Sequence, residues 1–208
     1  MSLTVITYDG PMGRWEPNAR GRLEKAAMTL YLERGFEETT VAEIAELAGL
    51  TERTFFRHFS DKREVLFAGA GALQELMVSA VRAAPASLSP FDVVARAVVA
   101  AGDAMGPGQE RALLRQRVID ANDDLKEREL IKLAALGRAL AHALIERGVD
   151  DPVASLAAEA GIAVFRVAFE RWVRGPAGAD LSDVIDSSIA TLSVITQARE
   201  PGKRQDHG

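Results

Sequence analysis

Cysteine is absent from the 208 residues, and only three histidines occur, His58, His142 and His207. Without thiols the chain has no disulfide framework, no thiolate metal site and no cysteine nucleophile. Three scattered histidines also argue against an all-histidine zinc site. We therefore expect no metal and no cofactor, and a chain without disulfides suits the cytoplasm, which is the localisation we expect.

Long apolar runs are also absent. The longest stretch without a charge is the 12 residues from Ser187 to Ala198, whereas a helix that spans a membrane needs about 18. The first residues, MSLTVITYDGPMGR, lack a basic segment ahead of an apolar one, so we expect neither a secretory signal nor a membrane partner. A net charge of -5 disfavours general binding of polyanions, so any contact with nucleic acid needs a local basic patch.

What is present reads as helix throughout. Alanine, leucine, glutamate and arginine fill segments in which apolar residues recur at three and four, and no alternating strand pattern occurs. We predict an all-α fold of about nine helices. The expected ranges are 18–34, 40–48, 51–59, 61–83, 90–105, 109–120, 124–147, 152–174 and 181–198.

The breakers divide the chain into four parts. Residues 1–17 are expected to form a flexible arm, 18–65 a three-helix unit, 66–198 a helical bundle, and 199–208 a disordered tail. The helix that begins near Asp61 is expected to connect the unit to the bundle. Charged residues between 115 and 128 are expected to solvate helix ends and to make surface ion pairs.

The segment VAEIAELAGLTERTFFRHF has the pattern of a helix-turn-helix. Thr40 and Glu43 form a capping box at the start of the first helix. Ala45 and Gly49 stand four residues apart, where a small side chain and a tight turn let two short helices cross. The second helix then presents Arg53 to the major groove, where a guanidinium can offer two donors to guanine.

A local basic patch accompanies this motif, because residues 53–63 carry a net charge of +3. The stretch from Arg20 to Leu66 resembles the DNA-binding domain of the TetR family of transcriptional regulators. The resemblance rests on LEKAA, RGFEETTV, IAELAGLT and TFFRHFSDKREVL. The family usually has tyrosine where this chain has Phe56, so the hydroxyl that would reach a phosphate is missing.

The resemblance implies a set of DNA contacts. Some residues would lie along phosphates and others near base edges. In this chain the set is Thr40, Thr51, Arg53, Thr54, Phe56, Arg57, His58 and Lys62. Arg14, Arg20 and Arg22 are weaker candidates for an arm that reaches the minor groove.

The resemblance also implies a homodimer, a ligand pocket and an operator with an inverted repeat. The dimer would form through the helices at 152–174 and 181–198, with the residues Gly161, Val164, Phe165, Ala168, Val184, Ile185, Ser188 and Leu192. A small-molecule ligand would bind among the middle helices. Met105, Arg115, Phe165, Phe169 and Trp172 are candidates there, but core packing explains each of them as well, so the ligand residues stay unassigned.

We therefore expect a ligand-responsive transcriptional repressor that is not an enzyme. Two other classes stay open: a helical small-molecule carrier or enzyme whose first helices only pack, and an interaction module that does not bind DNA. No paired catalytic carboxylates and no phosphate-binding glycine loop support an enzyme. Ligand identity, operator sequence and the sign of regulation are not specified by the sequence.

Overall fold

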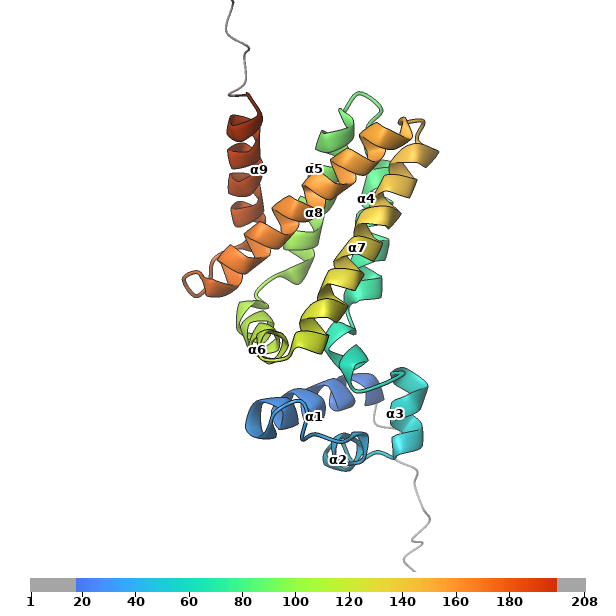
Figure 1. Ribbon diagram of the computed structural model, residues 1–208, viewed down its shortest axis with the longest axis vertical. Helices are drawn as coiled ribbons and strands as arrows, with labels where there is room; N and C mark the ends of the chain where they lie inside the picture. Colours follow the sequence, from blue (N-terminus) through green and yellow to red (C-terminus); the bar gives the residue numbers. More distant parts are fainter. Residues whose placement is uncertain (1–17, 198–208) are drawn as a thin grey trace, which may run out of the picture.

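The computed structural model describes residues 18–197, and in this range it contains nine α-helices, one 3-10 helix and no strand. The predicted all-α fold is confirmed. Figure 1 shows a small lower unit, here called the head, beneath a longer bundle, here called the body. The head consists of α1 (Ala19–Arg34), α2 (Val41–Leu47), α3 (Glu52–His58) and the 3-10 helix η1 (Arg63–Phe67).

The body consists of six helices. They are α4 (Ala70–Ala83), α5 (Pro90–Met105), α6 (Gln109–Asp120), α7 (Asp123–Glu146), α8 (Asp151–Arg174) and α9 (Leu181–Gln197). In Figure 1, α9 and α8 diverge upward from the turn that joins them, and α6 lies crosswise between the lower ends of the body helices and the head. The sequence pattern located all six helices to within a few residues, except at the start of α4.

The connector between head and body differs from its prediction. A continuous helix was expected over 61–83, but the chain forms η1, then a turn, and α4 begins only at Ala70. Asp61 accepts hydrogen bonds from the backbone N–H groups of Arg63 and Glu64, at 2.8 and 3.1 Å. This capping starts a tight turn, and Gly69 precedes α4 without a side-chain cap. The head is therefore joined to the body by a bent segment and not by a straight helix.

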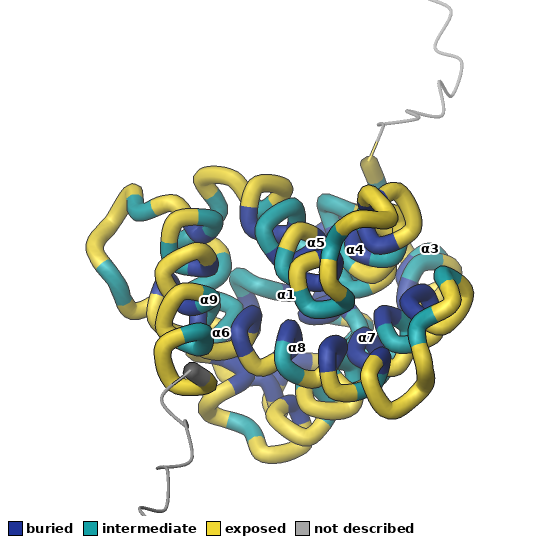
Figure 2. The backbone as a smooth tube through the Cα atoms, turned by 90° about the horizontal axis from the view of Figure 1, so that it is seen from above, coloured by how far each residue is buried: buried dark blue, intermediate teal, exposed yellow. Residues whose placement is uncertain are grey.

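Two apolar cores lie one above the other. The body core draws on α4, α5, α7, α8 and α9. The head core is built from α1, α2, α3 and η1, but it also contains Val118 and Ile119 of α6 and Leu125 of α7. The three-helix unit predicted at 18–65 thus has its core completed by residues more than 50 positions downstream. Figure 2 shows the buried backbone running along the inner faces of the helices.

Two helical stretches of the described range, Arg63–Ala83 and Asp151–Arg174, are apolar and long enough to cross a membrane by composition alone. In α8 the apolar residues serve another purpose. Ala154, Ala168 and Trp172 are all at most 1% exposed within the body core. Gly161 is also buried, and a Cβ at this position would lie 2.2 Å from Val94 Cγ1 on α5, so α8 packs closely against α5 here.

Candidate nucleic-acid interface and the junction that holds it

The second and third helices cross as the sequence pattern predicts. Thr40 caps α2 in a full capping box with Glu43, whose carboxylate accepts from the Thr40 N–H at 2.9 Å. Ala45 is 2% exposed in the contact, and Gly49 turns the chain with φ 65°. A side chain at Gly49 would be strained by that φ, and its Cβ would lie 2.7 Å from the guanidinium of Arg22. The geometry is that of a helix-turn-helix.

The third helix presents an outward face without internal partners. Thr51 caps it by accepting from the Thr54 N–H at 3.2 Å, and the two threonine hydroxyls lie 3.1 Å apart. Arg53 and Arg57 are exposed, and the Phe56 ring between them is 55% exposed. The exposed ring and the two guanidinium groups together form a face that is partly apolar and partly cationic. This face is suited to a partner that offers both acceptors and apolar edges.

Most cations of the head already make contacts within the chain. Five cations of the described head make hydrogen bonds or ion pairs within the chain, namely Arg20, Arg22, Arg34, Lys62 and Arg63. Three others have no such contact described: Lys25, Arg53 and Arg57. Arg20 donates to the Ala68 carbonyl at 2.6 Å, and Arg22 donates to the Ala48 carbonyl. Both therefore fasten α1 to its neighbours. Arg14, the third candidate for an arm, lies outside the described residues.

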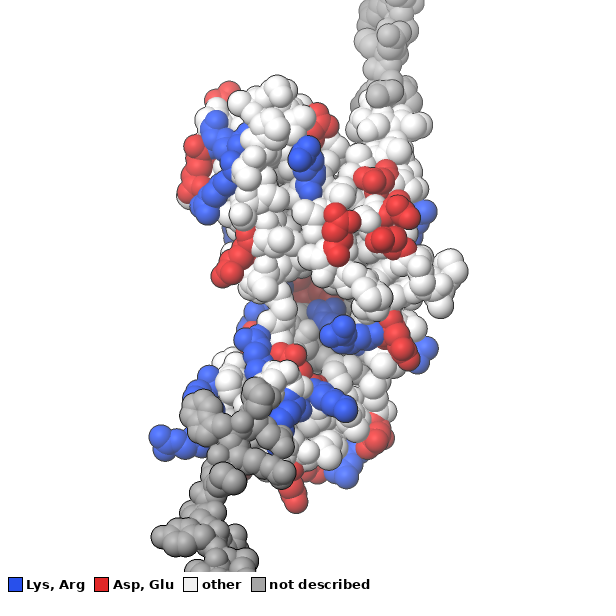
Figure 3. Space-filling view, turned by 180° about the vertical axis from the view of Figure 1, so that it is seen from behind, with Lys and Arg blue, Asp and Glu red and all other residues white. Residues whose placement is uncertain are grey.

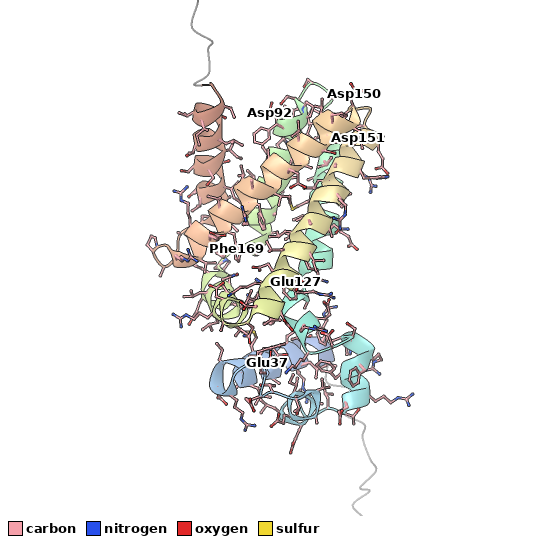
Figure 4. All side chains as sticks on the ribbon, viewed as in Figure 1. Glu37, Asp92, Glu127, Asp150, Asp151 and Phe169 are labelled. Carbon is pink, nitrogen blue, oxygen red and sulfur yellow. The ribbon has the colours of Figure 1, made fainter. Side chains whose placement is uncertain are left out.

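Lys62 lies in a different environment from the one predicted. Its ammonium donates to the carbonyls of Phe36, Glu37 and Thr39, at 2.8, 3.0 and 3.0 Å, and sits 4.4 Å from the centroid of the Phe36 ring. Three donors and three acceptors match, so the group has no donor left for a phosphate. Tyr31 also donates to the Lys62 carbonyl at 2.6 Å. The lysine predicted to touch DNA instead closes the turn between α1 and α2, where Figure 4 labels Glu37.

Replacing Lys62 by alanine is expected to destabilise the head. Three carbonyls lose a charged donor, and we expect the free energy of unfolding to fall by about 2–3 kcal/mol. Urea denaturation measures the loss, with Lys25→Ala as the control, because Lys25 makes no such contact and its removal should change stability by less than about 0.5 kcal/mol. A phosphate contact would instead leave stability intact and lower the salt slope of DNA binding by about one per head.

His58 also turns away from the outward face. Its Nε2 is buried and has no hydrogen-bond partner, and the residue lines a cleft of about 570 Å³ between head and body. The cleft is formed by α1, the end of α3, η1, the start of α4 and Lys132 of α7. Figure 3 shows this narrowed junction from behind, with basic side chains around it and over the head. Of the eight predicted DNA contacts, His58 and Lys62 are thus the two that point inward.

The junction is held by an ion-pair cluster on Glu64. Arg128 donates to this carboxylate at 2.8 and 2.5 Å, and Lys132 donates at 2.9 Å. Burial opposes the charge on Glu64, but the hydrogen bonds and charges of Lys132 and Arg128 outweigh it, so the pKa of this carboxyl lies below its ordinary value. Arg128 belongs to the charged stretch predicted to solvate helix ends and to make surface ion pairs. It joins the body helix α7 to the head.

This cluster predicts a pH-dependent stability. Because the pKa of Glu64 is lowered in the folded chain, its contribution is present above the ordinary carboxyl pKa and is lost as the pH falls through the folded value. Glu64→Gln should lower the free energy of unfolding by about 1 kcal/mol near pH 7, since Arg128 and Lys132 are partly solvent-screened. Urea curves on both proteins should converge as the pH falls below about 4. Glu75→Gln, which removes an exposed carboxylate without a described partner, should show no such convergence.

The sixth helix is held by hydrogen bonds of its first residue and of a residue near its middle. At its start, Gln109 donates to the Trp172 and Pro176 carbonyls at 2.7 and 3.1 Å and accepts from the Gly178 N–H at 2.9 Å. Near its middle, Arg115 donates to the Leu66 carbonyl at 2.7 Å and pairs with Glu129. Burial lowers the pKa of Arg115 more than Glu129 raises it. The helix therefore links the turn between α8 and α9 directly to η1 of the head.

The residues predicted for a dimer interface lie inside the chain. Six of them are buried within the described monomer and the other two, Val184 and Leu192, pack against the same core; the six are Gly161, Val164, Phe165, Ala168, Ile185 and Ser188. The three-four rhythm marks the inward stripe of each helix, because that stripe is the more apolar one. The predicted interface residues therefore face the core of the single chain.

The opposite face of the same two helices is exposed and apolar. On α8, Leu156 is 73% and Val167 45% exposed, and on α9, Val194 is 68% and Ile195 67% exposed. Small residues accompany them on this outer face, namely Ala160, Ala163, Ser187, Ala190 and Thr191. A patch of large apolar side chains among small ones suits close packing against other helices.

The candidate ligand residues divide between core and junction. Trp172 is 1% exposed and donates to the Ala179 carbonyl at 2.8 Å, and Phe165 is 5% exposed. Phe169 is half-buried between these two rings, on the part of α8 just above α6 (Figure 4). Gln116 has a buried Oε1 without a partner. Among the described residues, no group of three or more His, Asp or Glu side chains is placed to hold a metal ion.

Comparison with known proteins identifies the chain. Residues 23–68 match the family model described as bacterial regulatory proteins of the tetR family, and residues 88–196 match the model of the MftR C-terminal domain. Together these matches cover the head and nearly all of the body. The chain belongs to the TetR family. It is a transcriptional regulator with an N-terminal helix-turn-helix, and the alternative of a helical carrier or enzyme is not favoured.

Individual relatives agree with this assignment. The regulator TcmR of Streptomyces glaucescens is 36% identical over 96 residues, which span 45% of this chain and 42% of TcmR. The repressor BepR of Brucella suis is 28% identical over 192 residues, spanning 85% of this chain and 90% of BepR. FadR of Thermus thermophilus, solved in complex with lauroyl-CoA, is 25% identical with a TM-score of 0.54, covering 88% of this chain and 97% of FadR.

Proposed function

We propose that this TetR-family regulator is a cytoplasmic homodimeric repressor that binds an inverted-repeat operator and is released by a small molecule. The observation that carries the DNA part is the outward face of α3, where Arg53, Phe56 and Arg57 are exposed and the two arginines make no described hydrogen bond or ion pair. We assign direct contacts to these three, with backbone contacts from the helix starts at Thr40 and Thr51 and from Thr54. His58 and Lys62 act by shaping the head. The chain itself has no catalytic role in this proposal.

The proposed dimer forms through the outer face of α8 and α9. Leu156, Val167, Val194 and Ile195 supply the large side chains of the contact. A two-fold axis through this face generates a four-helix contact and presents two copies of α3 to successive major grooves, about 34 Å apart. Each head binds one half-site, so the affinity of the dimer for its operator depends on both.

The proposed ligand acts through α6. Because Gln109 holds the turn between α8 and α9, and Arg115, Val118 and Ile119 hold the head, a ligand that shifts α6 changes the spacing of the two heads. The ligand shifts the protein from one spacing of the heads to the other only if it binds the second arrangement more tightly than the first. The first class to test is an acyl-CoA, because the similar FadR was solved with lauroyl-CoA. In this proposal α6 transmits the movement from the body to the head, and the helix expected to begin near Asp61 does not.

The test is a displacement experiment. A duplex enriched from a random pool by the full-length protein is labelled, bound near physiological salt, and titrated with lauroyl-CoA, coenzyme A alone and lauric acid, while fluorescence anisotropy reports release. Release by lauroyl-CoA alone supports an acyl-CoA effector. Release by none of the three, with DNA binding intact, excludes this ligand class and leaves the DNA part of the proposal standing. Failure to enrich any duplex contradicts the DNA part.

A further inference from the structure

The recognition helix begins with an acidic residue that no neighbour neutralises. Glu52 is the first residue of α3, directly after the cap Thr51. It is exposed and makes no hydrogen bond or ion pair with any described residue. Some carboxylates of the head are paired, for example Glu24 with Arg20 and Glu43 with Arg34, whereas Glu46 on α2 is, like Glu52, exposed without a described partner. The position at the helix start is the part of a recognition helix that reaches base edges.

A free carboxylate at this place opposes DNA binding unless it reads a base. Within the described head, Lys25, Arg53 and Arg57 are the cations without internal partners, and Glu52 stands next to Arg53 on the face that would meet DNA, so its charge reduces the attraction of that face for phosphates. A carboxylate can only accept hydrogen bonds. In the major groove, guanine and thymine present acceptors, which repel a carboxylate. Adenine presents an amino donor, but its N7 acceptor lies beside it. Cytosine presents the N4 amino donor, which a carboxylate can accept from.

We infer that Glu52 is a specificity-determining residue that accepts a hydrogen bond from the N4 amino group of a cytosine in each operator half-site. The inference rests on the proposed function, because it needs α3 in the major groove. Glu52 then selects in two ways: it rewards cytosine and it repels duplexes that place guanine or thymine at that position. Arg53 reads a guanine independently, since adjacent helical residues point in different directions.

The experiment selects duplexes from a random pool with four full-length proteins: wild type, Glu52→Gln, Glu52→Ala and Glu46→Gln. Glu46 is an exposed carboxylate on α2 without a described partner, so its removal changes the charge of the head equally without touching a base. Wild type should enrich a motif with one cytosine per half-site preferred about fivefold over the other bases. Glu52→Gln should move that preference to adenine, and Glu52→Ala should erase it.

The control separates charge from readout. Glu46→Gln should raise affinity for all duplexes by a similar factor and leave the motif unchanged. If Glu52→Gln behaves in the same way, with an unchanged motif and a parallel rise in affinity, Glu52 only repels phosphates or stabilises the start of α3, and the inference is overturned. If wild type enriches no motif at all, the proposed function fails and this inference fails with it; a wild-type motif without the cytosine overturns the inference alone.

Discussion

Arg53→Ala is expected to remove most of the sequence preference of DNA binding. A guanidinium that donates two hydrogen bonds to guanine contributes about 1–3 kcal/mol of discrimination, so loss at both half-sites should weaken operator binding by about 2–6 kcal/mol. Arg53 is exposed and has no internal partner, so the folded protein should keep its stability. Binding to operator and to random duplex, measured by anisotropy at several salt concentrations, gives the difference between specific and general loss.

Two further variants sharpen this result. Arg53→Lys keeps the charge but not the planar pair of donors, so it should lose discrimination while keeping affinity for random DNA. Arg96→Ala removes the same charge from α5, where the side chain is exposed and far from the head, and should change neither quantity. An equal loss of operator and random binding by Arg53→Ala would show that Arg53 contacts phosphate and not a base.

Val167→Glu is expected to separate the dimer. The side chain is 45% exposed in the single chain, so the substitution should be tolerated by the fold. In the proposed dimer the carboxylate becomes buried without a partner, which costs several kcal/mol at each of two symmetric positions. Light scattering should report a monomer, and operator affinity should fall at least about 100-fold, because each head then binds its half-site alone.

The matched control is Leu130→Glu. Leu130 is 56% exposed on α7, outside the face formed by α8 and α9, and its substitution introduces the same charge. This variant should remain a dimer with normal operator affinity. A dimeric Val167→Glu protein beside a monomeric Leu130→Glu protein would move the interface to α7 and refute the proposed arrangement.

The sequence predicted those features that depend on neighbours along the chain. The capping box at Thr40 and Glu43, the turn at Gly49 and the helix ranges of the body follow from local hydrogen bonding, backbone freedom and periodicity. The outward position of Arg53, Phe56 and Arg57 has the same local origin. Once Phe55 faces the core at 0% exposure, the rotation of the seven-residue helix about its axis is set, and these three side chains point to solvent.

Features that depend on distant partners were missed. The hydrogen bonds of the Lys62 ammonium to three carbonyls about 25 residues earlier in the chain were not predicted. The head core takes Val118, Ile119 and Leu125 from α6 and α7, and no local pattern marks those residues as different from body residues.

The uncovered face of α8 and α9 also depends on packing that the sequence pattern does not show. Periodicity identifies the most apolar stripe of a helix, and on α8 and α9 that stripe fills the core of the chain itself. The outer stripe, with Leu156 and Val194, is weaker in pattern because small and polar residues lie between its large ones. Only the three-dimensional packing shows which stripe is left uncovered.

The central claim is that two heads, spaced by a dimer, bind one operator. The most direct measurement is the stoichiometry and affinity of full-length protein on the selected inverted repeat, compared with the same duplex carrying about five extra base pairs between its half-sites, a half turn of the helix. The account predicts two protomers on the selected duplex and a loss of at least about 100-fold on the lengthened one. Equal affinity for both duplexes, or a single bound protomer, would contradict it.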